Sequence, residues 1–147
     1  MESKHYIPIK RISLSEQKLI LRARYPNSKC FIKKNTLVWT GDIRPSALSR
    51  YYHVKIIYRD CWLRPNVILY GDVPGITRTD FPHHFKLDQE RKTVELCLHL
   101  PYEFNGKTQI IADLIIPWTQ DWLFFYEIWL ATGNWCGGGH KTRVSSP

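Results

Sequence analysis

Four segments rich in β-branched and aromatic residues follow one another between residues 29 and 70. They cover residues 29–34, 36–43, 51–58 and 66–70, and short stretches with turn residues separate them. This composition, bounded by turn residues, is typical of strands. A parallel pair needs a crossover of a dozen or more residues, usually a helix, and no helical pattern separates these segments. The sequence therefore predicts a four-stranded antiparallel meander.

A helix is predicted on the N-terminal side of the meander. Ser13, followed three residues later by Glu16, forms a capping box. The helix is expected over residues 14–24 and should end at Tyr25-Pro26, because the residue before a proline disfavours helical geometry. Its apolar side is expected to comprise Leu14 and Leu21, flanked by Leu19, Ile20 and Ala23.

The chain after the meander is predicted to be a long loop followed by helices. Residues 71–92 are rich in turn residues, and loops of this length usually carry function. A short apolar segment, residues 94–101, follows. One helix is expected near residues 108–116 and a stronger one from Thr119, its candidate cap, to Ala131, with Gly133 as the stop. The expected fold is thus a single α+β domain over residues 1–147, with helices at both ends and residues 137–147 as a flexible tail.

The charge of the chain is unevenly distributed. The 147 residues carry 21 Lys and Arg against 13 Asp and Glu, and residues 1–64 hold 14 of the basic and 4 of the acidic residues. A basic half favours an acidic partner, either nucleic acid or an acidic protein surface. Most tryptophans lie in the acidic half, whereas a binder of single-stranded nucleic acid needs aromatic residues beside basic ones.

No targeting or membrane-spanning pattern is found in this sequence. The first residues lack the apolar core of a signal peptide, and no apolar run reaches ~18 residues. We therefore expect a cytoplasmic protein with no membrane partner. Its four cysteines, Cys30, Cys61, Cys97 and Cys136, are expected to be reduced thiols.

Cys97 stands at the exit of the long loop, close in sequence to His83, His84 and His99. One interpretation is a small buried core residue, and the other is a nucleophile assisted by a neighbouring histidine. A zinc site made by Cys97, His99, Cys136 and His140 has the right number of ligands but an unusual spacing. The glycines at 137–139 lack the strand, helix and Lys-Ser/Thr context of a phosphate-binding loop.

Several short motifs resemble ubiquitin-conjugating enzymes. The stretch LVWTGDIRP at residues 37–45, residues 51–58 and Pro65-Asn66-Val67 look like the sheet of that family, and VELCL at residues 94–98 is similar to its active-site segment. The bacterial members found in type II CBASS antiphage operons resemble the chain more closely. They share similar motifs with LCLH at 96–99, the aromatic helix at 117–129 and GNWCGGGH at 133–140.

The resemblance implies a ubiquitin-conjugating-like transferase with Cys97 as the nucleophile. Cys97 would carry the C-terminus of a cGAS-like nucleotidyltransferase as a thioester and pass it to an amine, with no metal or cofactor. The His-Pro-Asn motif of the eukaryotic family is absent from this sequence, and Pro82-His83-His84 stands near its place. His83 or His84 would then assist Cys97, and the sequence leaves open which one does.

The resemblance also implies a docking role for the first helix. In related enzymes this helix contacts the activating partner, so Lys18, Arg22 and Arg24 are expected to bind an acidic protein surface. Whether a separate E1-like activating enzyme loads Cys97 stays open. The alternatives are an E2-like adaptor without catalytic activity and a basic nucleic-acid-binding domain, although we expect no nucleic-acid partner.

Overall fold

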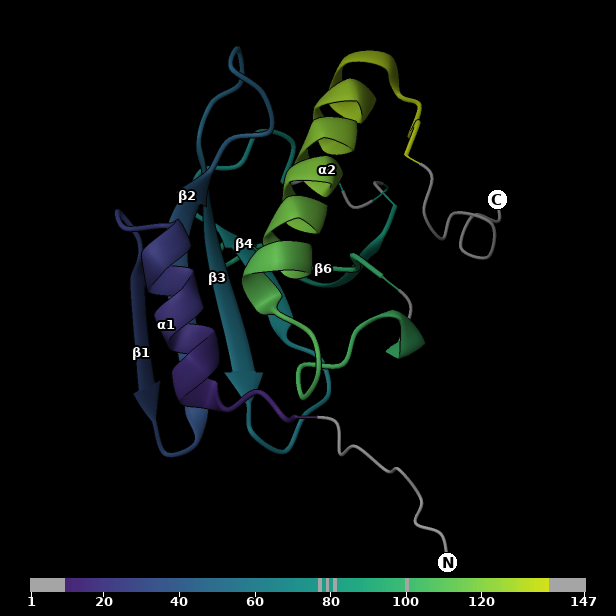
Figure 1. The fold of residues 1–147 in the computed structure, drawn as a ribbon. Coiled ribbons are helices and arrows are strands. Elements are labelled where there is room, and N and C mark those ends of the chain that lie inside the picture. The colour runs from purple at the N-terminus through teal and green to yellow at the C-terminus, as the bar shows by residue number, and fades with distance from the viewer. Residues whose placement is uncertain (1–9, 77, 79, 81, 100, 138–147) are drawn as a thin grey trace, which may run out of the picture.

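A computed structural model describes residues 10–76, 78, 80, 82–99 and 101–137 (Figure 1). The elements in chain order are α1 (Leu14–Arg24), β1 (Lys29–Lys33), β2 (Thr36–Ile43), β3 (Tyr52–Arg59), β4 (Asn66–Tyr70), β5 (His84–Asp88), β6 (Thr93–Leu96), the short 3-10 helix η1 (Pro101–Glu103) and α2 (Ile111–Thr132). The strands form one sheet in the order β1-β2-β3-β4-β6-β5, and α1 and α2 cover the same face of it (Figure 1).

The antiparallel meander predicted from the sequence is confirmed in strands β1 to β4. Consecutive strands pair antiparallel, with Val38 opposite Phe31 and Ile57 opposite Val38. Lys34 and Asn35 connect β1 to β2, and both have positive φ, 51° and 59°. Two such residues make the tight turn whose twist matches that of a hairpin.

Within the described residues the sheet has six strands, two more than the four that were predicted. Residues 71–92, expected to be loop, contain β5, and β6 inserts between β5 and β4. β5 was missed because it is a short edge strand of polar composition, HFKLD, without the alternation of buried and exposed residues that marks β3. As a result, the apolar segment before Cys97 is β6, an internal strand of the sheet between β4 and β5.

The hydrophobic core lies between the sheet and the two helices. Alternate residues of the central strands point into it because side chains alternate across a strand. These residues include Leu37, Trp39, Val54, Ile56, Val67, Leu69, Val94 and Leu96. No helix within the described ranges is both long and apolar enough to cross a membrane.

Helix α1 begins and ends as predicted, but its buried side differs. Ser13 and Glu16 form the expected capping box. Leu21 is buried, whereas Leu19 is 70% exposed and Ala23 is also exposed, which corrects the expectation for these two residues. The other fully buried side chain is Gln17.

Gln17 joins α1 to the start of α2. Its Nε2 donates to the carbonyls of Gly106 and Gln109 at 3.0 and 2.8 Å, and its Oε1 accepts from the Ile111 N–H at 3.0 Å. α2 has no capping side chain of its own at Ile110. Gln17 therefore satisfies one of the N–H groups that a helix N-terminus leaves without a partner.

Helix α2 replaces the two C-terminal helices that were predicted. It runs without a break through Pro117, its seventh residue. A proline inside a helix costs ~3 kcal/mol. Burial of one large aliphatic side chain gains ~1.5–3 kcal/mol, so the buried Ile115, Ile116 and Leu123 together outweigh that cost.

Of the two predicted ends of the second helix, the C-terminal one is confirmed and the N-terminal one is wrong. Thr119 is not a cap, because it lies inside α2 and its buried Oγ1 donates to the Ile115 carbonyl at 2.7 Å. Gly133 is the stop that was predicted, with a left-handed φ of 78°. Of the tail predicted at 137–147, Gly137 is buried, and residues 138–147 lie outside the described residues.

We predict that Gln17→Ala lowers the free energy of unfolding by about 2–3 kcal/mol, because buried groups left without a partner are costly. Urea unfolding measures this change. Gln120→Ala is the matched control, since Gln120 is exposed on α2, and it should change stability by less than about 0.5 kcal/mol. Equal effects of the two substitutions would contradict the role given to Gln17.

Candidate active site around Cys97

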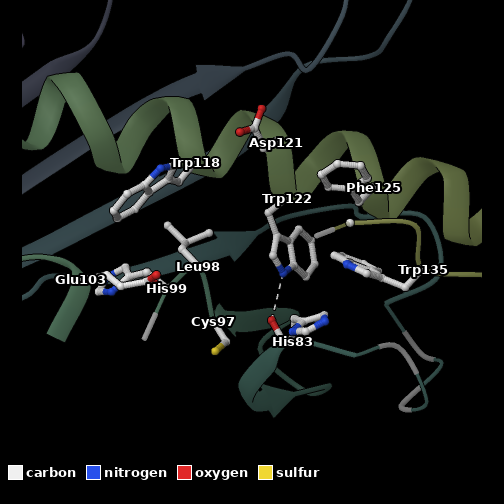
Figure 2. Close-up of a pocket in the computed structure, with 11 residues that line it drawn as sticks. His83, Cys97, Leu98, His99, Glu103, Trp118, Asp121, Trp122, Phe125 and Trp135 are labelled. Atoms are coloured by element: carbon white, nitrogen blue, oxygen red, sulfur yellow. Dashed lines mark hydrogen bonds between the residues drawn. The ribbon is translucent and has the colours of Figure 1, made fainter. Parts of the chain in front are cut away.

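The main-chain carbonyl of His83 positions Cys97. This carbonyl accepts the Cys97 N–H and the Trp122 indole N–H, each at 2.9 Å (Figure 2). His83 immediately precedes β5, Cys97 immediately follows β6, and Trp122 lies on α2. One oxygen therefore holds three segments together.

His83 adopts a backbone conformation that is uncommon for a residue with a side chain. Its φ is 63°, in the left-handed region. Such a conformation in a residue other than glycine is strained and is often found at functional sites. Here it turns the chain into β5, whose first residue, His84, pairs with Leu96.

A pocket of about 230 Å³ opens beside Cys97. One wall comes from α2, where Trp118, Trp122 and Phe125 recur at helical spacing. The opposite side comes from the Cys97 segment and η1, and Trp135 lies at one end (Figure 2). Gly137 also lines the pocket. The remaining lining residues are His83, Leu98, His99, Glu103 and Asp121.

The Cys97 thiol is half-buried, and its surroundings favour the neutral form. Burial raises the pKa of Cys97, and the nearby Arg64 charge lowers this pKa by a smaller amount. The thiolate is the reactive form of cysteine, so at neutral pH most Cys97 is in the less reactive thiol form. None of the four cysteines, all of which lie in the described part of the chain, forms a disulfide.

The three histidines near Cys97 in sequence occupy different places. His83 is buried and its ring lies 5.3 Å from that of Trp135. His99 is buried against Trp118 and Phe104. His83 and His99 both line the pocket, whereas His84 belongs to β5 and does not.

The sequence did not reveal the aromatic wall. The helical spacing of the aromatic residues of 118–135 is typical of core positions, and Trp122, Tyr126 and Trp129 are indeed buried. Trp118 and Phe125, however, are only half-buried and line the pocket. The sequence does contain one sign of this partial exposure. The aromatic residues of the helix extend around more of its circumference than a single buried face requires.

The basic residues predicted to bind a partner lie away from Cys97. α1 packs against β1 and β2, whereas Cys97 follows β6, with β3 and β4 between them in the sheet. Lys18 and Arg22 line a shallow groove with the exposed Leu19. Arg24 is engaged within the chain, since its guanidinium pairs with Asp113 of α2.

The zinc alternative gains no support from the part of the chain that the structure describes. It contains no group of three His, Cys, Asp or Glu side chains that could hold a metal ion. His140, the fourth residue of that proposal, lies outside the described residues.

A family model described as "Type II CBASS E2 protein" matches residues 17–142. The chain belongs to this family. The match begins in α1 and includes the whole sheet, the Cys97 segment and α2. The resemblance inferred from the short motifs is confirmed. None of the curated proteins compared with the chain matches it.

Membership makes this a CBASS-associated E2-like protein, which associates with other proteins of CBASS operons.

The raised pKa of Cys97 leads to a prediction about its reactivity. The rate of Cys97 alkylation by iodoacetamide should keep rising beyond pH 9, because a higher thiol pKa delays formation of the thiolate. Mass spectrometry of the Cys97 peptide gives this rate.

The reference for that measurement is a small free cysteine derivative, whose rate levels off above its pKa of ~8.5. If alkylation of Cys97 reaches its plateau at or below pH 8.5 in the folded protein, burial does not control this thiol.

Proposed function

We propose that this protein is an E2-like transferase that carries the C-terminus of a partner protein as a thioester on Cys97. The observation that supports the proposal best is a cysteine outside any disulfide that follows β6, lines a pocket and belongs to an E2-family chain. By analogy with the family, the partner is a cGAS-like nucleotidyltransferase, and the conjugation serves antiphage defence in the cytoplasm.

The first chemical step is acyl transfer to Cys97. The thiolate attacks the carbonyl carbon of the partner's C-terminus, a C–S bond forms, and the group that activated the carboxyl leaves. A free carboxylate does not react in this way, so the acyl group must arrive as a mixed anhydride with a nucleotide or as a thioester. The leaving group is then AMP or a thiolate.

In the second step an acceptor amine attacks the thioester. The amine nitrogen forms an amide bond, the C–S bond breaks, and the Cys97 thiolate is released and takes up a proton. Stabilisation of the developing oxyanion usually contributes strongly to such reactions. The Cys97 N–H already donates to the His83 carbonyl, so we assign this role to other groups around the pocket, the His83 and His99 side chains first among them.

Two alternative functions remain to be tested. The raised pKa of Cys97 is the observation that favours an adaptor without catalytic activity. The nucleic-acid alternative fits poorly, because the partly accessible aromatic residues of the pocket stand beside the carboxylates of Glu103 and Asp121 rather than beside basic residues.

The decisive experiment is intact-mass analysis after co-expression with the nucleotidyltransferase and the other proteins of the same operon. Wild-type protein should show an adduct that hydroxylamine cleaves, and Cys97→Ala should show none. Cys97→Ser should accumulate a more stable oxyester. Cys61→Ala and Cys136→Ala are the matched controls and should conjugate like wild type. If Cys97→Ala conjugates as well as wild type, the proposed function is wrong.

A second prediction concerns docking through α1. The double substitution Lys18→Glu with Arg22→Glu should slow adduct formation on Cys97 at least 10-fold, because it repels an acidic partner surface. Time courses of adduct formation measure the rate. Lys29→Glu with Lys33→Glu changes the net charge equally on exposed β1 residues that do not pack against the core, and should leave the rate unchanged. Equal rates for the two double variants would refute docking through α1.

A further inference from the structure

The chain turns back on itself directly after α2. Gly133 ends the helix with a left-handed φ of 78°, a conformation that glycine adopts readily. The Asn134 N–H then donates to the Thr132 hydroxyl oxygen at 3.0 Å. We call residues 134–137 the return segment. These contacts direct the return segment back toward the pocket beside Cys97, which two of its residues line.

Trp135 of the return segment contacts both His83 and helix α2. Its ring centroid lies 5.3 Å from that of His83, 5.2 Å from that of Trp122 and 6.3 Å from that of Phe125 (Figure 2). Ring pairs at such separations attract one another. Trp135 therefore attaches the return segment to the helix and to the residue that precedes β5.

Gly137 permits this close packing because it has no side chain. A Cβ atom at this position would lie 2.6 Å from Trp135 Nε1 and 2.8 Å from the Phe125 ring, closer than Cβ atoms approach other atoms in proteins. Glycine is the residue that allows such an approach of the main chain. The return segment therefore fits tightly against these two rings.

His83 needs two kinds of contact to be held in one orientation. The Cys97 N–H and the Trp122 indole N–H fix its main-chain carbonyl. A fixed main chain does not determine the side-chain torsions, which still have several staggered states. Trp135 contacts the imidazole ring itself. Trp122 thus holds the main chain of His83, and Trp135 restricts its side chain.

We propose that Trp135 is a positioning residue, which holds the His83 side chain at the pocket that Cys97 lines. The inference rests on the proposed function, in which the His83 side chain assists Cys97, and adds a residue that acts through it. A displacement of about 1 Å in a reacting group can slow a reaction about 100-fold. Loss of the Trp135 contact should therefore slow acyl transfer without removing a reacting group.

The kinetic test uses a synthetic peptide that ends in Gly, prepared as a thioester of 2-mercaptoethanesulfonate. The Cys97 thiolate attacks the carbonyl carbon, a new C–S bond forms, the old one breaks, and 2-mercaptoethanesulfonate leaves as a thiolate. No activating enzyme is required. Intact-mass time courses should show a maximal acylation rate about 10-fold lower for Trp135→Ala than for wild type. Trp135→Phe keeps a ring beside His83 and should retain most of the rate.

Two further substitutions locate the effect. Gly137→Ala adds a methyl group that displaces Trp135 without removing its ring, and it should slow acylation as Trp135→Ala does. Phe124→Ala removes a ring of α2 that is 43% exposed and does not line the pocket, and it should keep the wild-type rate. If Phe124→Ala and Trp135→Ala slow acylation equally in folded proteins, the positioning role is overturned.

A double-mutant cycle tests whether Trp135 acts through His83. His83→Ala removes the imidazole, keeps the main-chain carbonyl and should slow acylation. Adding Trp135→Ala to His83→Ala should slow it no further, because there is no imidazole left to position. Two independent losses that multiply, or a wild-type rate for His83→Ala, would overturn the proposal.

Nuclear magnetic resonance tests the contact without any chemistry. Carbon relaxation of the histidine rings gives their order parameters, which report side-chain motion on the picosecond to nanosecond timescale. The order parameter of the His83 ring should fall in Trp135→Ala. His53, an exposed residue of β3 whose ring stacks on Tyr70, is the internal reference and should not change. An unchanged order parameter for His83 overturns the positioning role, whatever the acylation experiment shows.

The two experiments separate the two proposals. Acylation of Cys97 that Trp135→Ala does not slow supports the proposed function and overturns the positioning role. A wild-type protein that the thioester does not acylate contradicts Cys97 as the acyl carrier. In that case a lower order parameter for His83 in Trp135→Ala still supports Trp135 as the residue that holds the imidazole.

Discussion

The geometry around Cys97 depends on one main-chain oxygen, the His83 carbonyl. Each of its two hydrogen bonds contributes only ~1 kcal/mol to stability, but together they join the paired strands β5 and β6 to helix α2. The left-handed φ of His83 costs a comparable amount, and the structure retains it because it aims this carbonyl between Cys97 and Trp122. The main chain at Cys97 and the aromatic side of α2 are therefore held to the same oxygen.

Helix α2 is the element that links the two ends of the molecule. At its N-terminus the buried Gln17 amide attaches it to α1, and at its middle Trp122 attaches it to the His83 carbonyl. Both attachments are buried polar contacts between distant parts of the sequence. The proposed docking helix and the Cys97 segment thus share one support, although they lie at different places along the sheet.

Much of this fold could be predicted from local signals. The capping box at Ser13 and the stop at Gly133 follow from backbone chemistry, and the strands of the meander are rich in residues that favour strands. β5 could not be found, because its stability comes from pairing with β6 rather than from its own composition. The continuity of α2 through Pro117 was also hidden, since tertiary burial on both sides of the proline decides it.

The candidate site was predictable only in part, for the same reason. The short motif around Cys97 marked the thiol, but the choice between His83 and His84 depends on a positive φ and a carbonyl direction that adjacent identical residues do not encode. The structure brings His83 to the pocket and leaves His84 in β5. The aromatic wall could not be predicted, because helical spacing alone does not distinguish a ring packed in the interior from one that lines a pocket.

A raised thiol pKa and a pocket beside the thiol are both compatible with the proposed carrier of acyl groups. A thiol that is mostly protonated at neutral pH reacts slowly with adventitious electrophiles and oxidants. Reaction then needs a donor that is both activated and held beside the sulfur long enough for the minor thiolate form to attack. Holding two reacting groups in place compensates for a low concentration of the reactive form. Under the proposed function, burial of the sulfur therefore limits its reaction with other electrophiles rather than making it exceptionally reactive.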